Sequence, residues 1–216
     1  MKIKNNTGFT IIELLIATLV FSIILLVVAY SAISIGRIYY RGITDSKTQD
    51  IARNAIDDIS KAIQFNGGDI KIATVTGGTS GFCVGGRLYS YKLFTEVSGT
   101  THALVADTLG GGCSAAEDIG STPPTTSSEL LGERMRLTLL CISTPTHPCN
   151  DLNDNVGLYE VRVRVVYGDD DLLQDKLGAD GNPGSDGVVD SCKDIRFGTE
   201  FCTASELKTI VQKRVQ

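Results

Sequence analysis

The sequence has little of what nucleic-acid-binding proteins and zinc proteins need. It lacks tryptophan, and its 20 basic residues are outnumbered by 25 acidic ones, which gives a formal net charge of -5. That charge balance argues against nucleic-acid binding through a basic surface. The 6 cysteines form no CxxC pair, and only His102 and His147 could join them as ligands, so no zinc site is expected.

Catalytic motifs are missing as well. The sequence contains no nucleotide-binding glycine loop, no GxSxG and no HExxH motif. His102 and His147 lie in loop-like segments and are expected to be surface histidines, not a general base or a metal ligand. The cysteines have no sequence context typical of a thiol with a lowered pKa, which indicates a structural role. We therefore expect no enzyme activity and no required cofactor.

Charged residues are also absent from the apolar run between Leu14 and Ile35, which is 22 residues long. As a helix this run measures about 33 Å, enough to cross a hydrocarbon core of about 30 Å. The residues before it include Lys2 and Lys4, and basic flanks normally stay cytoplasmic. A secretory signal would have a shorter apolar region followed by a small residue, whereas Gly8 precedes this one. The run is therefore predicted to span a membrane.

One acid, Glu13, lies at the start of this apolar stretch. A carboxylate at membrane depth costs a few kcal/mol, so it should have a partner or a function. The segment GFTIIELLIA, residues 8–17, resembles the N-terminal motif of type IV prepilins and type II secretion pseudopilins. The resemblance implies that prepilin peptidase cleaves after Gly8 and methylates the new terminus at Phe9.

The same resemblance implies a role for Glu13 in filament assembly. After cleavage it would be the fifth mature residue, and in filaments of this family that carboxylate pairs with the terminal amine of a neighbouring subunit. Such a pair would offset the desolvation cost of both charges inside an apolar bundle.

A helical pattern returns in the second half of the N-terminal segment. Gly36 and Gly42 weaken the helix locally, but four apolar residues then recur at helical spacing and predict one face packed on a core: Ala52, Ile56, Ile59 and Ile63. The predicted fold class is α+β and pilin-like, with the long helix packed on an antiparallel sheet. Its expected parts are a leader (1–8), a membrane and filament-core half-helix (9–35), an amphipathic half-helix (36–66) and a disulfide-stapled β-rich domain (67–216).

Alternation of apolar and polar residues predicts the strands of the globular part. They are expected at residues 70–75, 87–97, 134–142 and 158–167, and residues 207–215 fit either a strand or a short helix, with the family resemblance favouring a strand. In the third of these segments one face is expected to hold Met135, Leu137, Leu139 and Cys141. Residues 114–128 and 144–155 are predicted to be loops.

All 6 cysteines follow the apolar run. Their even number, behind an N-terminal membrane signal, indicates three disulfides in an oxidising compartment, and reduced buried thiols are the alternative. Sequence proximity suggests Cys141–Cys149 and Cys192–Cys202, which leaves Cys83–Cys113. The sequence alone does not decide among the fifteen possible pairings of six cysteines.

An acidic, glycine-rich loop suggests a calcium site. Three consecutive aspartates at 169–171 are followed by LGADGNPGSDGVVDS at 177–191, a composition that suits a hard cation with oxygen ligands but does not match an EF-hand. The loop resembles the calcium loop of the major pseudopilin of type II secretion. That resemblance implies ligands at the Leu177 carbonyl and the Asp180 carboxylate, with Asp186 and Asp190 as candidates for a later acid. A solvated acidic turn is the alternative.

The functional expectation is a minor pilin of a type IV pilus. Major pilins often have a helix-breaking glycine or proline where this chain has Ser22 and Tyr30, and residues 52–64, ARNAIDDISKAIQ, resemble the helix end of PilW- and PulJ-type minor pilins. Expected partners are other pilin subunits, prepilin peptidase and the assembly platform with its ATPase. The subunit would cross the cytoplasmic membrane once, with its globular domain outside, and then join a cell-surface filament.

Two alternatives stay open at this stage. One is a type II secretion pseudopilin, which the calcium-like loop favours. The other is a membrane-anchored adhesin or DNA-uptake receptor.

Overall fold

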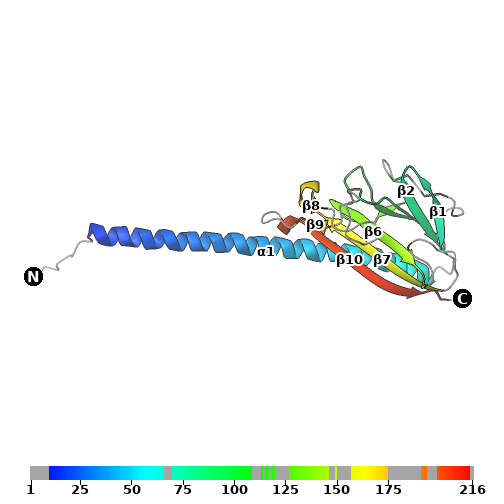
Figure 1. Cartoon of the computed structure of the whole chain (residues 1–216), viewed down its shortest axis with the longest axis horizontal. Helices are drawn as coiled ribbons and strands as arrows, with labels where there is room; N and C mark the ends of the chain where they lie inside the picture. The colour runs from blue at the N-terminus through cyan, green and yellow to red at the C-terminus, as the bar shows by residue number, and fades with distance from the viewer. Residues whose placement is uncertain are drawn as a thin grey trace, which may run out of the picture. The chain divides into compact units, whose positions relative to one another are not determined.

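The computed structural model (Figure 1) describes most of the chain after the leader. The described residues are 10–65, 70–108, 113, 115–116, 118–119, 127–145, 149, 157–174, 191–193 and 199–214. The chain divides into two compact units, Met1–Tyr40 and Arg41–Gln216.

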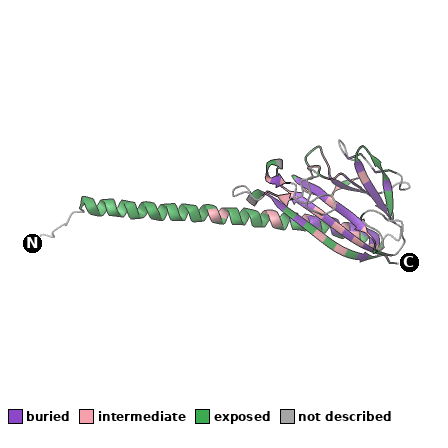
Figure 2. Ribbon diagram, viewed as in Figure 1, coloured by how far each residue is buried: buried purple, intermediate pink, exposed green. Residues whose placement is uncertain are grey.

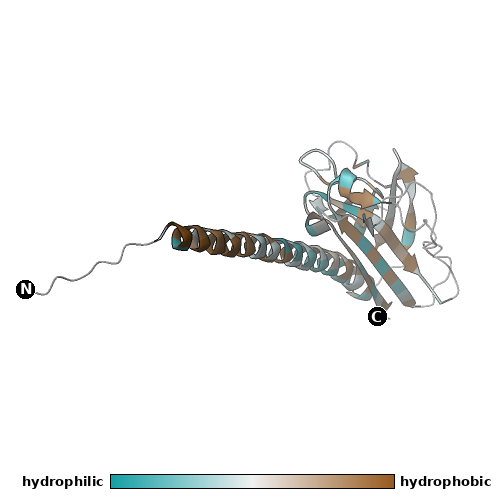
Figure 3. Cartoon of the chain, turned by 60° about the vertical axis from the view of Figure 1, so that its left-hand side comes forward, coloured by the Kyte–Doolittle hydropathy of each residue, from teal (hydrophilic) through white to brown (hydrophobic). Residues whose placement is uncertain are grey.

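Helix α1 (Ile11–Phe65) has 55 residues and is about 82 Å long. It continues through Gly36 and Gly42, where an added Cβ would meet no atom within 4 Å. From Ile11 to Tyr40 the helix buries no side chain (Figure 2), and the ribbon of its N-terminal part is coloured as hydrophobic (Figure 3). The first unit is therefore an apolar rod without a core of its own.

The second unit contains the distal part of α1, which carries the predicted apolar face. All four residues of that face are buried, and further small or polar residues extend it: Thr48, Ala55 and Ala62. The helical periodicity of the sequence therefore located the packed face correctly. The small side chains on this face let the sheets approach the helix closely, which suits a dense core.

The first sheet is a five-stranded antiparallel meander in the order β1-β2-β3-β4-β5. Its strands are β1 (Lys71–Thr76), β2 (Thr79–Val84), β3 (Arg87–Tyr91), β4 (Leu104–Thr108) and β5 (Ser128–Glu129). Gly81 in β2 is needed for packing, because an added Cβ would lie 2.9 Å from both the Tyr89 carbonyl oxygen and the Ala116 side chain.

The second sheet is antiparallel with the order β10-β7-β6. Its strands are β6 (Met135–Ser143), β7 (Leu158–Tyr167) and β10 (Thr203–Gln212). A short ribbon pairs β8 (Leu173–Gln174) with β9 (Ser191–Cys192), and single 3₁₀ turns occur at η1 (Asp170–Leu172) and η2 (Thr199–Phe201). The final segment is therefore a strand, which begins at Thr203, four residues before the predicted start.

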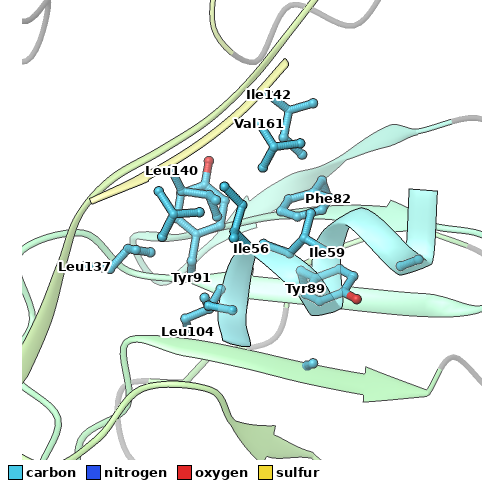
Figure 4. Close-up of a cluster of buried hydrophobic side chains, with 14 of the residues drawn as sticks. Ile56, Ile59, Phe82, Tyr89, Tyr91, Leu104, Leu137, Leu140, Ile142 and Val161 are labelled. Atoms are coloured by element: carbon cyan, nitrogen blue, oxygen red, sulfur yellow. The ribbon is translucent and has the colours of Figure 1, made fainter. Parts of the chain in front are cut away.

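One core joins the helix to both larger sheets (Figure 4). Ile56 and Ile59 of α1 lie among side chains of the first sheet (Phe82, Tyr89, Tyr91 and Leu104) and of the second (Leu137, Leu140, Ile142 and Val161). The fold is thus α+β and pilin-like, a long N-terminal helix with antiparallel sheets, as the sequence predicted.

The predicted strand from Arg87 to Val97 is wrong beyond Tyr91. Phe94 has a φ of 61°, which breaks the extended backbone. The chain then leaves the first sheet for the edge of the second, where the N–H groups of Phe94 and Val97 donate to the carbonyls of Leu137 and Met135.

The predicted face of β6 is also wrong in part, because the strand contains a β-bulge. The register with β7 shifts between Leu137 and Leu139, so the intervening Thr138 is an extra residue. An extra residue moves all later side chains to the opposite face. Leu140 and Ile142 therefore enter the main core in place of the expected Leu139 and Cys141.

Candidate functional site at the helix N-terminus

The first turn of α1 is closed by a reciprocal pair of side chains. The backbone N–H and the hydroxyl of Thr10 each donate to Glu13 Oε2 at 3.0 Å, and the Glu13 N–H donates to Thr10 Oγ1 at 3.3 Å. This is a capping box, which satisfies backbone donors that a helix start otherwise leaves open. Sequence reasoning missed the role of Thr10, although the T-x-x-E spacing before an apolar run is its signal.

The apolar run behind this cap presents its side chains outward. The side chain of Leu26, near its middle, is 71% exposed, and that of Ile35, at its end, is 68% exposed. By length and composition, α1 is the one helix of the described chain that could cross a membrane. An exposed apolar surface of this extent requires lipid or neighbouring apolar helices to cover it.

Three hydroxyl groups within the run are satisfied by the helix itself. Thr18 Oγ1 donates to the Leu15 carbonyl at 3.0 Å, Ser22 Oγ to the Thr18 carbonyl at 2.7 Å, and Ser31 Oγ to the Val27 carbonyl. Polar groups in hydrocarbon need such internal partners, because no water is available there. These three side chains are therefore compatible with a lipid-facing helix.

The predicted processing residues, Gly8 and Phe9, lie outside the described residues. Glu13 lies in the first turn of the helix with its carboxylate exposed, and the structure brings it to Thr10. In a single chain, the Glu13 carboxylate is therefore hydrogen-bonded to Thr10 of the same segment. Its predicted pairing with a neighbouring subunit stays a prediction.

The six cysteines form three disulfides. The pairs are Cys83–Cys113, Cys141–Cys149 and Cys192–Cys202, the same pairs that sequence proximity suggested. Cys83–Cys113 ties β2 to a segment beyond β4, and Cys192–Cys202 ties the short ribbon to the start of β10. Each bridge therefore fixes irregular chain to a sheet, which is the role expected of structural disulfides.

His102 is not the surface histidine that was expected. Its side chain is only 17% exposed, and its Nδ1 lies 3.4 Å from Glu129 Oε2. The correction has a physical reason, since Glu129 accepts the backbone N–H groups of Ala103, Leu104 and Leu131 and so folds the histidine segment against β5. His147 lies outside the described residues.

The candidate calcium ligands Leu177, Asp180, Asp186 and Asp190 also lie outside the described residues. Among the residues that the structure does describe, no group of three or more His, Cys, Asp or Glu side chains could hold a metal ion. Asp169, the first acid of the preceding run, is bound to the guanidinium of Arg134 through Nε at 3.1 Å. The calcium site stays a prediction.

Comparison with known proteins gives one match, and it falls on this N-terminal site. The model of the prokaryotic N-terminal methylation motif matches residues 3–29, which include Glu13 and most of the apolar run. No curated protein and no solved structure matches the chain. The motif supports a type IV pilin- or pseudopilin-like precursor that prepilin peptidase processes, and the apolar helix fits a membrane-anchored subunit that assembles with other pilins.

Proposed function

We propose that this pilin-like precursor is a minor subunit of a type IV pilus, cleaved between Gly8 and Phe9, N-methylated at Phe9 and assembled through α1. The observation that carries the proposal is the methylation motif at residues 3–29, placed on a helix that exposes apolar side chains all round. No catalytic constellation is needed for such a role, because the protein acts by anchoring and packing.

Before assembly, the helix rests in the membrane. Its apolar side chains face lipid, and the hydroxyls of Thr18, Ser22 and Ser31 are bonded to the helix backbone. The costly group is the Glu13 carboxylate at the start of the run, which the Thr10 cap stabilises through two hydrogen bonds.

During assembly, Glu13 would meet the terminal amine that cleavage creates on a neighbouring subunit. Both bonds from Thr10 end on Oε2, so an incoming ammonium could reach Oε1 without displacing the cap. An ammonium–carboxylate pair removes two uncompensated charges from the apolar bundle at once and fixes the axial register of the subunits.

Two variants separate pairing by charge from local capping. Glu13→Gln retains a side chain that can complete a capping box but loses the negative charge. Thr10→Val removes the hydroxyl of the cap and leaves the charge. We expect Glu13→Gln to abolish recovery of the subunit in sheared filaments of its own host, and Thr10→Val to incorporate normally.

The controls for this experiment are membrane abundance and leader cleavage, which should be unchanged in both variants. If Glu13→Gln incorporates as well as the wild type while Thr10→Val fails, then Glu13 acts as a cap only. That result would contradict the assembly role of the charge.

A type II secretion pseudopilin is the second candidate, favoured by the LGADG-containing loop at 177–191. The two systems differ in the genes that accompany them. Retraction and pilus-assembly genes beside this gene would support the pilus, and a secretion operon would support the pseudopilin.

A further inference from the structure

One of the three disulfides lies against a guanidinium. Arg162 on β7 is the register partner of Cys141 on β6. Its Nη2 lies 3.6 Å from Cys141 Sγ and 3.4 Å from Cys149 Sγ. The bulge at Thr138 creates this contact, because it moves Cys141 from the core face of β6 to the face that bears Arg162.

Among the described residues, the acid paired with Arg162 is Glu160, and it neutralises the positive charge only loosely. Glu160 Oε1 lies 3.4 Å from Arg162 Nε, whereas Glu160 Oε2 holds Lys208 Nζ at 2.8 Å. Arg162 Nε is buried, and no hydrogen-bond partner for it occurs within the described part of the chain. The two sulfurs therefore lie in an electropositive environment, which stabilises a thiolate.

The two sulfurs differ in access. Cys149 is exposed, whereas Cys141 is completely buried. Neither of the other two disulfides has an exposed member, since Cys83 and Cys202 are buried and Cys113 and Cys192 are half-buried. Attack by an external thiolate is thus directed to one sulfur of one bridge.

We propose that Cys141–Cys149 is a thiol–disulfide exchange site that accepts electrons from an external dithiol, beyond the assembly function of the subunit. The dithiol first loses a proton to water. Its thiolate attacks Cys149 Sγ, the bond between Cys149 and Cys141 breaks, and the electron pair leaves on Cys141 Sγ. The guanidinium of Arg162 stabilises that leaving thiolate, and a more stable leaving group departs faster.

The second half of the exchange returns both cysteines to the reduced form. The remaining thiol of the reductant loses its proton and attacks its own sulfur in the mixed disulfide, and Cys149 leaves as a thiolate beside Arg162. The dithiol becomes a cyclic disulfide after giving up two electrons, and the two protein thiolates take up protons from water. The products are a reduced Cys141/Cys149 pair and an oxidised reductant.

The test is the opening rate of each disulfide in the folded, detergent-solubilised full chain. Samples are treated with dithiothreitol or with a reduced thioredoxin, quenched by alkylation and mapped by mass spectrometry. We expect Cys141–Cys149 to open first, at least fivefold faster than the other two bridges, which serve as controls within the same molecule. Opening by dithiothreitol alone would restrict the partner to small dithiols, and opening by both would admit a protein partner.

Charge variants test the role of Arg162. Because an adjacent opposite charge shifts a thiol pKa by about one unit or more, Arg162→Gln should slow opening about threefold to tenfold. Arg162→Lys, which keeps the charge, should stay within about twofold of the wild type. Melting temperatures of the two variants show whether either change merely loosens the fold.

A monothiol identifies the attacked sulfur. Glutathione should leave its adduct on Cys149. An adduct on Cys141, or equal opening rates for all three bridges, or equal rates in Arg162→Gln and Arg162→Lys, would overturn the proposal.

Discussion

At the scale of single residues, Asp58 joins the helix to the first sheet. Its Oδ2 accepts the Tyr89 hydroxyl at 2.9 Å, and its Oδ1 accepts Arg87 Nη1 at 2.8 Å. Arg87 also lies over the Tyr89 ring, 5.6 Å from its centroid. Burial and the charge of Asp58 raise the pKa of Tyr89 far above its ordinary value, so the hydroxyl remains a donor throughout the physiological range. This triad fixes the rotation of the helix against the sheet.

Removing the Tyr89 hydroxyl should weaken that joint. We expect Tyr89→Phe to lower the free energy of unfolding by about 1–2 kcal/mol, because one hydrogen bond to a charged group is lost inside the fold. Thermal denaturation followed by near-ultraviolet circular dichroism should show a melting temperature lower by a few degrees. Tyr39→Phe, on the exposed part of α1, is the matched control and should melt like the wild type.

Glu129 makes the stability of the globular unit depend on pH. Burial raises the pKa of its carboxyl above the ordinary range, and the N–H groups of Leu131, Ala103 and Leu104 and the charge of His102 lower it only in part. The folded state therefore binds a proton more tightly than the unfolded state. The stability that this pKa difference gives to the fold is fully present below the ordinary glutamate pKa. It is lost as the pH rises through the pKa that Glu129 has in the folded state.

We expect the melting temperature of the wild type, relative to Glu129→Gln, to fall between pH 4 and pH 7. The comparison is best made in a His102→Asn background, which removes the imidazole next to Glu129. If the melting temperature of the wild type rises relative to Glu129→Gln as the pH increases, the prediction is contradicted. The ionised carboxylate would then stabilise the fold through its backbone hydrogen bonds.

At the scale of elements, the bulge in β6 decides which side chains form the core. Leu140 is 2% exposed in the main core, whereas Leu139 is only partly buried. Leu140→Ala should therefore cost about 2–5 kcal/mol of unfolding free energy, and Leu139→Ala about 1 kcal/mol. Chemical denaturation of the two variants measures both values. A strand without the bulge would bury Leu139 in place of Leu140, so Leu139→Ala would then lose more unfolding free energy than Leu140→Ala.

Elements with one buried face were predictable from the sequence. The α1 face follows the helical period, and β7 runs from Leu158 to Tyr167 as predicted, with Val161 and Val163 inward and Arg162 outward. One inserted residue in β6 was not predictable, because a bulge leaves the composition of the strand unchanged.

Two strands buried on both faces, β2 and β4, escaped prediction. In β4, Leu104, Val105 and Ala106 are all buried, so no alternation marks the strand. The neighbouring β2 and β3 place Cys83 and Leu88 in a second apolar cluster, away from the main core. A sheet covered on both sides loses the two-residue period that identifies a strand.

At the scale of the whole molecule, the two units differ in how far their side chains are buried. The unit Arg41–Gln216 has its own core and three disulfides, whereas Met1–Tyr40 buries no described side chain. The match to the methylation motif lies entirely in the first unit, Met1–Tyr40. The part of the chain that fits a membrane anchor therefore falls in the first unit, and the folded core falls in the second.

Calcium should act on the globular unit if the loop at 177–191 is a binding site. We expect millimolar calcium to raise the melting temperature of the full chain in detergent, because a ligand bound only to the folded state stabilises it. Asp180→Asn should remove this effect, and magnesium should not replace calcium. Equal melting temperatures with calcium and with a chelator would leave the loop as a solvated acidic turn.

Mass spectrometry of the N-terminal peptide of the protein from its own host tests processing as a prepilin most directly. Cleavage after Gly8 followed by methylation predicts a peptide that begins at Phe9 and carries one N-methyl group. A peptide that begins at Met1, or one that begins after Ser31, would contradict processing as a prepilin.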